Sequence, residues 1–246
     1  MTDELAERTR VLARTTCPDA EPVTVWDNPL GGRTVRLDGD GAVRYLKVAP
    51  VTLPASHHPH REAERMVWVG GLLPVPTVQG NGQDRGLSWM LTDGLPGVPA
   101  SDPSWAADPR RLAQALGRGA RDFHDRLADR VADCPWRWDV AHRVATGQGN
   151  EQAARMAAAA PPEDDRVVAH GDLCAPNVLL GEDGTVTGWI DLGKLGVADR
   201  AADLGTLQWS LEFNGHGGLR DELLAAYGWR GDPARVQWYR DFYTVA

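Results

Sequence analysis

Disulfide, zinc and membrane features are missing from the sequence. The chain of 246 residues has three cysteines, Cys17, Cys134 and Cys174, which lie far apart and form no CxxC pair. An odd number of separated cysteines argues against a disulfide framework and against a zinc site. Residues 1–16 carry acids and arginines where a signal peptide would need an apolar run, and no stretch approaches the length of a membrane span. We therefore expect a cytoplasmic protein with reduced thiols and no membrane partner.

A basic surface is also missing. The formal net charge is -8 at pH 7, and no stripe of Lys or Arg runs along the chain. Because a nucleic-acid binder neutralises phosphates with basic side chains, we expect no nucleic-acid partner. A cationic small molecule suits this balance better, although many soluble proteins are mildly acidic for solubility alone. The apolar share of 42% and charged share of 24% are ordinary for a folded chain, and the length allows one large domain or two joined lobes.

The local pattern of the chain changes near residue 93. Between Val23 and Thr92, short β-like runs (VTVW, TVRL, VRYLKV and LSWML) are separated by Gly, Pro and Asp clusters and predict an antiparallel sheet. One helix interrupts these strands at REAERMVWVGG, where Glu62, Met66 and Val69 share a face at spacings of four and three. This part of the chain therefore predicts a sheet with one helix.

Longer alanine- and leucine-rich segments follow Gly94 and predict a mainly helical region. A strand ends at Met90, Leu91, Thr92 and Asp93 in the turn-forming sequence DGLPGVP, which we interpret as a hinge. The expected helices span residues 109–127, 141–145, 201–211, 219–227 and 233–242. We therefore predict an α+β fold with an N-terminal lobe of residues 1–93 and a C-terminal helical lobe of residues 94–246.

The stretches HGDLCAPNVLL (residues 170–180) and GWIDLGKLGVADR (188–200) carry the chemistry. Asp172 precedes Asn177 by five residues, the spacing of a kinase catalytic loop, and Asp191 begins the Asp-x-Gly of its metal-binding partner. Phosphoryl transfer passes through a loose transition state, so the protein mainly aligns the nucleophile and neutralises charge. Asp172 is the candidate catalytic residue that orients or deprotonates the acceptor hydroxyl. Asn177 and Asp191 are candidate ligands of Mg²⁺, which prefers hard oxygen donors.

Asp172 and Asn177 alone also fit a turn with a capping aspartate, since both residue types are common in turns. Their joint occurrence with Asp191 and Gly193 between β-like runs favours the kinase interpretation. We expect His170 to brace the loop, because it precedes a glycine and a better-placed carboxylate.

The N-terminal lobe should supply the nucleotide site. Lys47 lies in the strand-like VRYLKVAP and is the candidate to bridge the α- and β-phosphates of ATP or GTP. Glu62 is preferred over Glu64 as its partner because it shares the face of the apolar residues, and a solvated carboxylate is the alternative. Gly31 and Gly32 lack a GxGxxG pattern; their amides are expected near the triphosphate, and a simple hairpin turn is an equal alternative.

The strings HGDLCAPNVLL and IDLGKLGVADRAADL resemble aminoglycoside phosphotransferases, particularly the 3′-hydroxyl-specific branch. Further matches run through LKVAP, REAERMVWV, WMLTDGLPGVPA, FHDRLADRVADCPW and YGWRGDPARVQWYRDF, so the likeness covers most of the chain. The resemblance implies a protein-kinase-like fold and antibiotic resistance through transfer of the γ-phosphoryl group to an aminoglycoside hydroxyl. It implies the same roles for Asp172, Asn177, Asp191, Lys47 and Glu62, and it places Met90, Leu91 and Thr92 beside the adenine.

The sequence departs from the resemblance at several points. Leu30 replaces a serine of the nucleotide loop, residues 147–165 form a shorter segment, and Trp209 replaces a polar position. The tail RDFYTVA keeps Asp241 without an adjacent acid. These differences leave open an alternative in which the acceptor is another hydroxylated metabolite or antibiotic.

Two other classes are disfavoured. The chain has no APE motif and no room for a phosphorylated activation loop, which argues against a protein kinase. The intact candidate residues argue against a nucleotide-binding pseudokinase. For a cationic acceptor, the candidate acids of the helical lobe are Glu212, Asp221, Glu222 and Asp241.

Overall fold

The computed structural model describes residues 2–147 and 150–245, which form two compact units divided between Leu95 and Pro96. The expected lobe boundary lies two residues earlier. Residues 148–149, inside the segment 147–165, and residue 246 of the tail lie outside the described residues.

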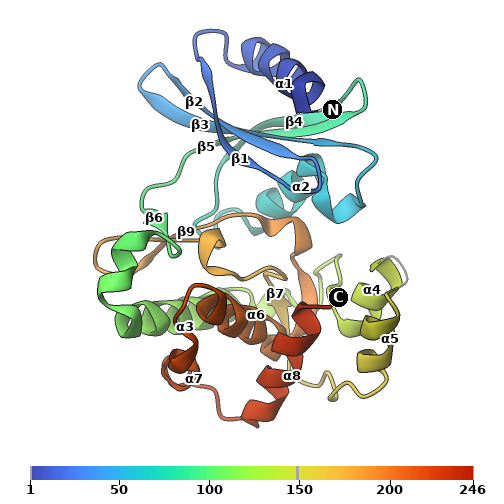
Figure 1. The fold of residues 1–246 in the computed structure, drawn as a ribbon, viewed down its shortest axis with the longest axis vertical. Helices are drawn as coiled ribbons and strands as arrows, with labels where there is room; N and C mark the ends of the chain where they lie inside the picture. Colours follow the sequence, from blue (N-terminus) through green and yellow to red (C-terminus); the bar gives the residue numbers. More distant parts are fainter. Residues whose placement is uncertain (1, 148–149, 246) are drawn as a thin grey trace. The chain divides into compact units, whose positions relative to one another are not determined.

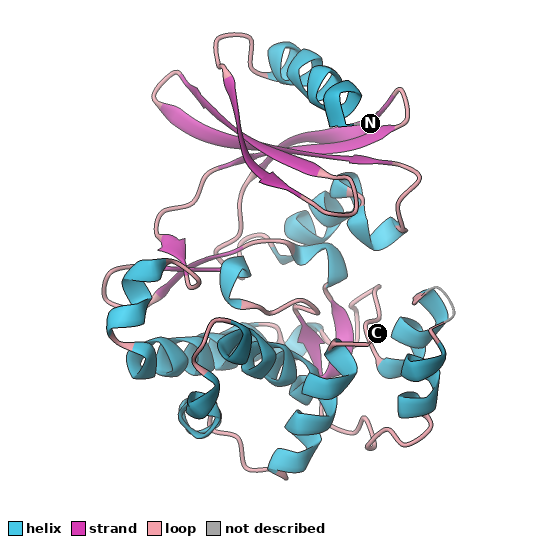
Figure 2. Ribbon diagram, viewed as in Figure 1, coloured by secondary structure: helices cyan, strands magenta, loops and turns pink. Residues whose placement is uncertain are grey.

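The first unit holds a five-stranded antiparallel sheet and two helices (Figures 1 and 2). Its elements are α1 (Thr2–Thr16), β1 (Pro22–Asp27), β2 (Arg33–Gly39), β3 (Ala42–Pro50), α2 (Pro59–Val69), β4 (Val78–Asp84) and β5 (Leu87–Asp93). The strand order is β1-β2-β3-β5-β4, so α2 connects β3 to β4, which are consecutive in the chain but separated by β5 in the sheet. The predicted sheet with one inserted helix is confirmed, while α1 and β4 were not predicted.

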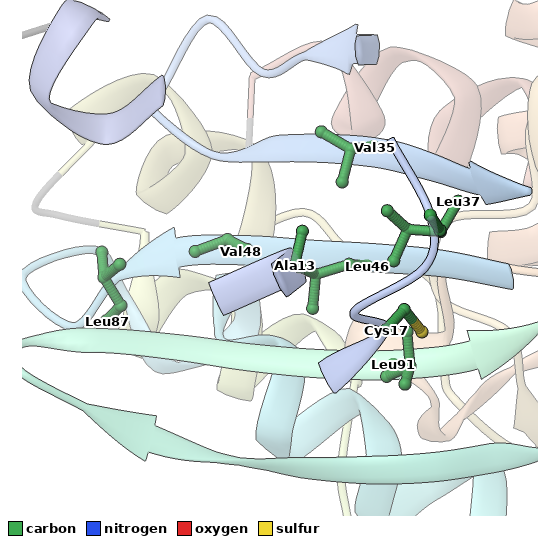
Figure 3. Close-up of a cluster of buried hydrophobic side chains, with 9 residues drawn as sticks. Ala13, Cys17, Val35, Leu37, Leu46, Val48, Leu87 and Leu91 are labelled. Carbon is green, nitrogen blue, oxygen red and sulfur yellow. The ribbon is translucent and has the colours of Figure 1, made fainter. Parts of the chain in front are cut away.

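The core of this unit lies between α1 and one face of the sheet. Figure 3 shows Ala13 and Cys17 among leucine and valine side chains that point from the sheet, including Leu46 and Val48 of β3. Successive side chains of a strand point to opposite faces. Lys47, between these two buried residues, therefore points to the opposite face, where α2 packs (Figure 1).

In its described residues, the second unit is mainly helical and has five short strands. Its elements are β6 (Val98–Pro99), α3 (Pro109–Arg126), α4 (Val140–Thr146), α5 (Glu151–Ala157), β7 (Arg166–Ala169), β8 (Val178–Leu180), β9 (Val186–Trp189), β10 (Gly196–Asp199), α6 (Arg200–Phe213), α7 (Arg220–Tyr227) and α8 (Pro233–Tyr243). Aspartates 108, 139, 199 and 232 cap four of the helices by accepting backbone N–H bonds. The predicted helical ranges agree with α3, α4, α6, α7 and α8 to within two residues.

The long helix α3 packs against α7 at a very close approach. A Cβ on Gly117 of α3 would lie 2.4 Å from the carbonyl oxygen of Leu223, so no other residue fits there without a shift of the helices. Helix α3 also packs against β7, and α6 packs against β7 and β10, the two strands beside the HGDLCAPNVLL and IDLGK segments. Within residues 2–147 and 150–245, no helix is both long and apolar enough to cross a bilayer.

Candidate active site

The motif residues lie in two loops that are held together by short strands of the second unit. The first loop connects β7 to β8, and the second connects β9 to β10. Antiparallel pairing of β7 with β10 and of β8 with β9 brings the loops side by side. Gly171 has a φ of +83°, and a Cβ there would lie 2.2 Å from the Lys194 carbonyl oxygen. The glycine of HGD is therefore required by the contact between the loops.

Both carboxylate oxygens of Asp172 receive hydrogen bonds. Lys194 Nζ donates to Oδ2 at 2.8 Å, and the Tyr243 hydroxyl donates to Oδ1 at 2.8 Å. The Asp172 side chain keeps 16% of its surface exposed. A carboxylate at this position is accessible and already accepts a hydroxyl hydrogen bond, which is the interaction that an acceptor alcohol would make.

Asn177 and Asp191 are brought together by the strand register. The Ile190 N–H donates to the Asn177 carbonyl oxygen at 3.1 Å, so Asn177 lies beside the residue that precedes Asp191. The Asn177 side-chain amide donates to the Asp172 backbone oxygen at 2.9 Å and contacts Cys174 Sγ at 3.4 Å. Because its N–H groups are directed into the loop, its Oδ1 is the amide atom left for a ligand.

Asp191 has left-handed backbone angles, φ 62° and ψ 52°. Among the described residues, Asp40 and Arg85 are the other non-glycines with positive φ, and both lie in hairpin turns. Backbone strain outside a hairpin turn is typical of a functional position. Asn177 and Asp191 fit Mg²⁺, which needs few protein oxygens because it keeps waters and phosphate ligands. Among residues 2–147 and 150–245, no group of three or more His, Cys, Asp or Glu side chains could hold a metal ion.

His170 joins the two loops from a fully buried position. Its Nδ1 accepts the Asp172 N–H at 3.3 Å, and its Nε2 donates to the Ile190 carbonyl oxygen at 3.1 Å. This pattern needs a neutral ring, in agreement with burial, which lowers the pKa of His170. The histidine therefore braces the loops, as the sequence suggested.

Lys47 and Glu62 form an ion pair of 2.7 Å in the first unit. The Glu62 side chain is 4% exposed and the Lys47 side chain 28%, whereas Glu64 is exposed on the outer side of α2. Glu62, which was preferred over Glu64 because it shares a helical face with apolar residues, is therefore the carboxylate that contacts Lys47.

The two glycines form a tight β1–β2 turn. The Gly31 N–H donates to the Asn28 carbonyl at 2.8 Å, and the Asn28 N–H donates to the Gly32 carbonyl at 2.8 Å. Gly31 has a φ of +109°, which favours glycine. The hairpin alternative describes this segment, because the Gly31 amide is used within the turn.

Met90, Leu91 and Thr92 lie inside β5 rather than in a hinge, since all three pair with β3. The Leu91 side chain is buried in the core under α1, on the face opposite Lys47, and Leu91 pairs with both β3 and β4. Met90 pairs directly with Lys47, and strand alternation places Met90 and Thr92 on the α2 face.

The sequence analysis missed four residues that contact Asp172, its loop or the C-terminal helix. Lys194 and Tyr243 bind Asp172, Asp203 holds the loop backbone, and buried Arg143 lies over the Phe242 ring at 4.6 Å. Burial lowers the pKa of Arg143 to about 10, although the nearby Asp172 charge opposes this change. Lys194 could have been singled out as a candidate site residue, because it is one of only two lysines in the sequence.

The acids considered for a cationic acceptor all have arginine partners. Arg240 contacts both Glu212 and Asp241, Arg110 pairs with Glu222 at 3.0 Å, and Arg220 pairs with the adjacent Asp221 at 3.1 Å. Their negative charges are therefore partly compensated by the protein itself.

Residues 30–239 match the model of the phosphotransferase enzyme family. An aminoglycoside 3′-phosphotransferase of Streptomyces ribosidificus is 35% identical over 198 residues, which cover 71% of this chain and 74% of that protein. The chain belongs to the aminoglycoside phosphotransferase family. A streptomycin 3″-kinase of Streptomyces griseus is 32% identical over 240 residues, covering 80% and 83% of the two chains.

Solved structures of aminoglycoside phosphotransferases share the fold of the whole chain. The crystal structure of an aminoglycoside-3′-phosphotransferase of type VIII aligns with a TM-score of 0.78 and 30% identity, covering 97% of this chain and 98% of that one. An aminoglycoside phosphotransferase from Streptomyces rimosus, solved in complex with ADP and streptomycin, aligns with a TM-score of 0.69 and 27% identity, covering 100% and 99%. The predicted α+β, kinase-like fold is confirmed.

Proposed function

We propose that this family member transfers the γ-phosphoryl group of ATP to a hydroxyl group of an aminoglycoside and thereby inactivates the antibiotic. The observation that carries this proposal is Asp172, an accessible carboxylate that accepts a hydroxyl hydrogen bond from Tyr243. The relatives' names and the complex of a similar enzyme with ADP and streptomycin support both the donor and the acceptor class.

In this reaction Asp172 orients the acceptor hydroxyl and accepts its proton as the acceptor oxygen bonds to the γ-phosphorus. The bond from the γ-phosphorus to the β–γ bridging oxygen breaks, and ADP leaves. Lys194 donates to this carboxylate at 2.8 Å and fixes its orientation. Asn177 Oδ1 and the Asp191 carboxylate would hold Mg²⁺. The bound ion neutralises charge on the triphosphate.

Residues of the first unit would bind the nucleotide. Lys47, which Glu62 holds at 2.7 Å, would contact the α- and β-phosphates. Met90, Leu91 and Thr92 of β5 would flank the adenine. Of the two turn glycines, Gly32 is the one whose amide we assign to the phosphates, because Gly31 donates within the turn. A nucleotide-dependent enzyme of this kind fits a cytoplasmic location, where ATP is available.

The proposal is tested by a nucleotide-consumption screen over aminoglycosides and other polyols, with ATP and with GTP. We expect ADP release with one or more aminoglycosides, and Asp172→Asn should lower turnover by about 10²- to 10⁴-fold with nearly unchanged nucleotide affinity. Asp183→Asn, in the exposed β8–β9 turn, is the matched control. If Asp172→Asn retained more than about a tenth of the turnover, the proton-accepting role would be wrong.

A second candidate keeps the chemistry and changes the acceptor to another hydroxylated compound. It is favoured by Arg240, which compensates both Glu212 and Asp241 next to the C-terminal aromatic residues. Consumption of ATP with neutral polyols but with no aminoglycoside would select it. No nucleotide consumption with any acceptor would instead indicate a binding protein.

A further inference from the structure

The C-terminal helix α8 reaches the candidate catalytic residue through its last side chain. Tyr243 closes α8, and its hydroxyl donates to Asp172 Oδ1 at 2.8 Å across 71 residues of sequence. The other carboxylate oxygen receives Lys194. Each oxygen of the proposed proton acceptor thus has a donor from the protein itself.

Aromatic packing holds the Tyr243 ring in place. Its centroid lies 5.0 Å from that of Trp209 on α6, and Trp209 stacks on Phe213 at 5.1 Å. The preceding residue, Phe242, is fully buried and stacks on Trp238 at 4.9 Å. The end of α8 is therefore fixed on both sides, which makes the contact with Asp172 a feature of the fold.

Tyr243 acts here as a neutral hydroxyl donor. Burial raises the pKa of Tyr243, and the negative charge of Asp172 raises it further. A neutral hydroxyl on a carboxylate oxygen is chemically the same arrangement as an acceptor alcohol before phosphoryl transfer. An acceptor alcohol that approaches Oδ1 along the same direction as the tyrosine hydroxyl has to displace that hydroxyl.

We propose that Tyr243 is a specificity-determining residue whose hydroxyl occupies the acceptor position on Asp172 until an acceptor displaces it. This inference rests on the proposed function of Asp172. While the tyrosine hydroxyl occupies this position, water cannot take it, and the bound nucleotide is protected from hydrolysis. In hydrolysis, a water oxygen would bond to the γ-phosphorus, the bond to the β–γ bridging oxygen would break, ADP would leave, and Asp172 would take the water proton.

The displacement also selects among acceptors. An acceptor displaces the hydroxyl only if its other contacts with the protein offset the lost Tyr243–Asp172 hydrogen bond. A single water molecule makes no such additional contacts. The half-buried Trp209 contacts the Tyr243 ring, and Phe213, which is 75% exposed, stacks on Trp209, so the two rings offer an aromatic surface to such an acceptor. Aromatic faces bind both apolar sugar faces and ammonium groups.

The experiment compares Tyr243→Phe with the matched control Tyr239→Phe. Tyr239 lies one turn earlier on α8, and its hydroxyl contacts Glu163 rather than Asp172. Acceptor-free ADP release, acceptor KM, kcat and nucleotide affinity are measured for both variants and for the wild type. The Phe ring keeps the packing against Trp209, and thermal unfolding checks that each variant is folded.

Tyr243→Phe should raise acceptor-free ADP release by about 3- to 10-fold and lower acceptor KM, because a hydrogen bond to a charged group no longer has to be broken. Nucleotide affinity should not change, and Tyr239→Phe should match the wild type in every measurement. A purely structural role of Tyr243 would lower all rates together and cannot produce a gain in hydrolysis.

Two results would overturn the inference. One is unchanged acceptor-free hydrolysis and unchanged acceptor KM in Tyr243→Phe while the wild type phosphorylates an acceptor. The other is a phosphate found on Tyr243 itself by mass spectrometry after incubation with ATP and Mg²⁺, since the tyrosine would then be a substrate. Failure of the proposed function is distinct, because in that case the wild type transfers phosphate to no acceptor.

Discussion

The carboxylate of Asp203 accepts a hydrogen bond of 2.7 Å from the backbone N–H of His170. Its other oxygen accepts the Gly171 N–H at 3.0 Å, and His124 Nε2 lies 3.1 Å from the first oxygen. Asp203 is fully buried in α6. A buried charge therefore fixes the two backbone amides that immediately precede the candidate catalytic Asp172.

Replacement of this carboxylate should destabilise the second unit. In Asp203→Asn, an amide NH₂ faces a backbone N–H that needs an acceptor, which leaves a buried donor unsatisfied. We expect the free energy of unfolding to fall by about 2–4 kcal/mol in urea titrations. Asp122→Asn, in an exposed i,i+4 pair with Arg126, should change it by less than about 0.5 kcal/mol. Equal effects of the two variants would contradict the bracing role.

Acid should destabilise the protein through His170. Burial lowers the folded-state pKa of His170 below its ordinary value. The unfolded chain then binds the proton first, so stability is lost as the pH falls below the unfolded value of about 6.5. The unfolding free energy is measured from pH 7.5 to 5 in the wild type and in His170→Gln. Its slope against pH should be smaller in the variant, and the difference between the two slopes should be at most about 1.4 kcal/mol per pH unit. An identical slope in the variant would show that His170 is not the titrating group.

Lys47→Ala should weaken nucleotide binding. Loss of a charge-assisted contact to phosphate corresponds to about 10- to 100-fold in affinity, measured by calorimetry. Glu62→Gln should have a smaller effect in the same direction, because the lysine loses its ionic partner at 2.7 Å. Glu64→Gln, on the exposed face of α2, should bind nucleotide like the wild type. If Lys47→Ala bound nucleotide with unchanged affinity, Lys47 would not be a phosphate-binding residue.

Asp191→Ala should weaken nucleotide binding and activity together, and it should raise the Mg²⁺ concentration needed for half-maximal nucleotide binding. The reason is that a lost carboxylate removes an ionic oxygen ligand from the cation. Magnesium titrations at fixed nucleotide measure the change directly. A magnesium requirement that stays at the wild-type value would remove Asp191 from the proposed ligand set.

Local spacing predicted that Asp172, Asn177 and Asp191 form one candidate site, because they belong to two short segments whose order and separation are visible in the sequence. The partners of Asp172 were not predictable in this way. Tyr243 lies 71 residues away, and only the packing of α8 on α6 brings its hydroxyl to the loop. No local pattern encodes such a contact.

Elements with weak local signals were also missed. Strand β4 reads VQGNGQD, with two glycines and no second apolar residue, and it forms because β5 supplies its hydrogen-bond partners at the sheet edge. The expected strand ended at Met90–Asp93 before DGLPGVP, and β5 ends at Asp93, where its pairing with β3 also ends. Pairing with neighbouring strands thus decides both that β4 forms and where β5 ends.

The ion pair of Arg240 with Glu212 lies one helical turn from the contact between Trp209 and Tyr243. Glu212 follows Trp209 by three residues on α6, and Arg240 precedes Tyr243 by three on α8, which places each pair on one helical face. One guanidinium there contacts two carboxylates, Glu212 and Asp241. The cluster therefore keeps one net negative charge close to the aromatic surface.

Arg240→Gln should strengthen binding of a cationic acceptor, because it removes the positive charge and leaves both carboxylates for the ammonium groups. At a separation of about 10 Å in water, one charge contributes about 0.4 kcal/mol, so acceptor KM should fall by about twofold for each nearby ammonium group. The gain should fade as salt rises, since screening acts over about 8 Å at physiological ionic strength. Acceptor KM is measured at low and high salt, with a neutral polyol and with nucleotide affinity as controls. A twofold or larger gain that persists at high salt, or that occurs equally with a neutral acceptor, would show that the effect is not electrostatic. No change with any aminoglycoside would place the acceptor away from the α6–α8 surface and favour a neutral hydroxylated compound.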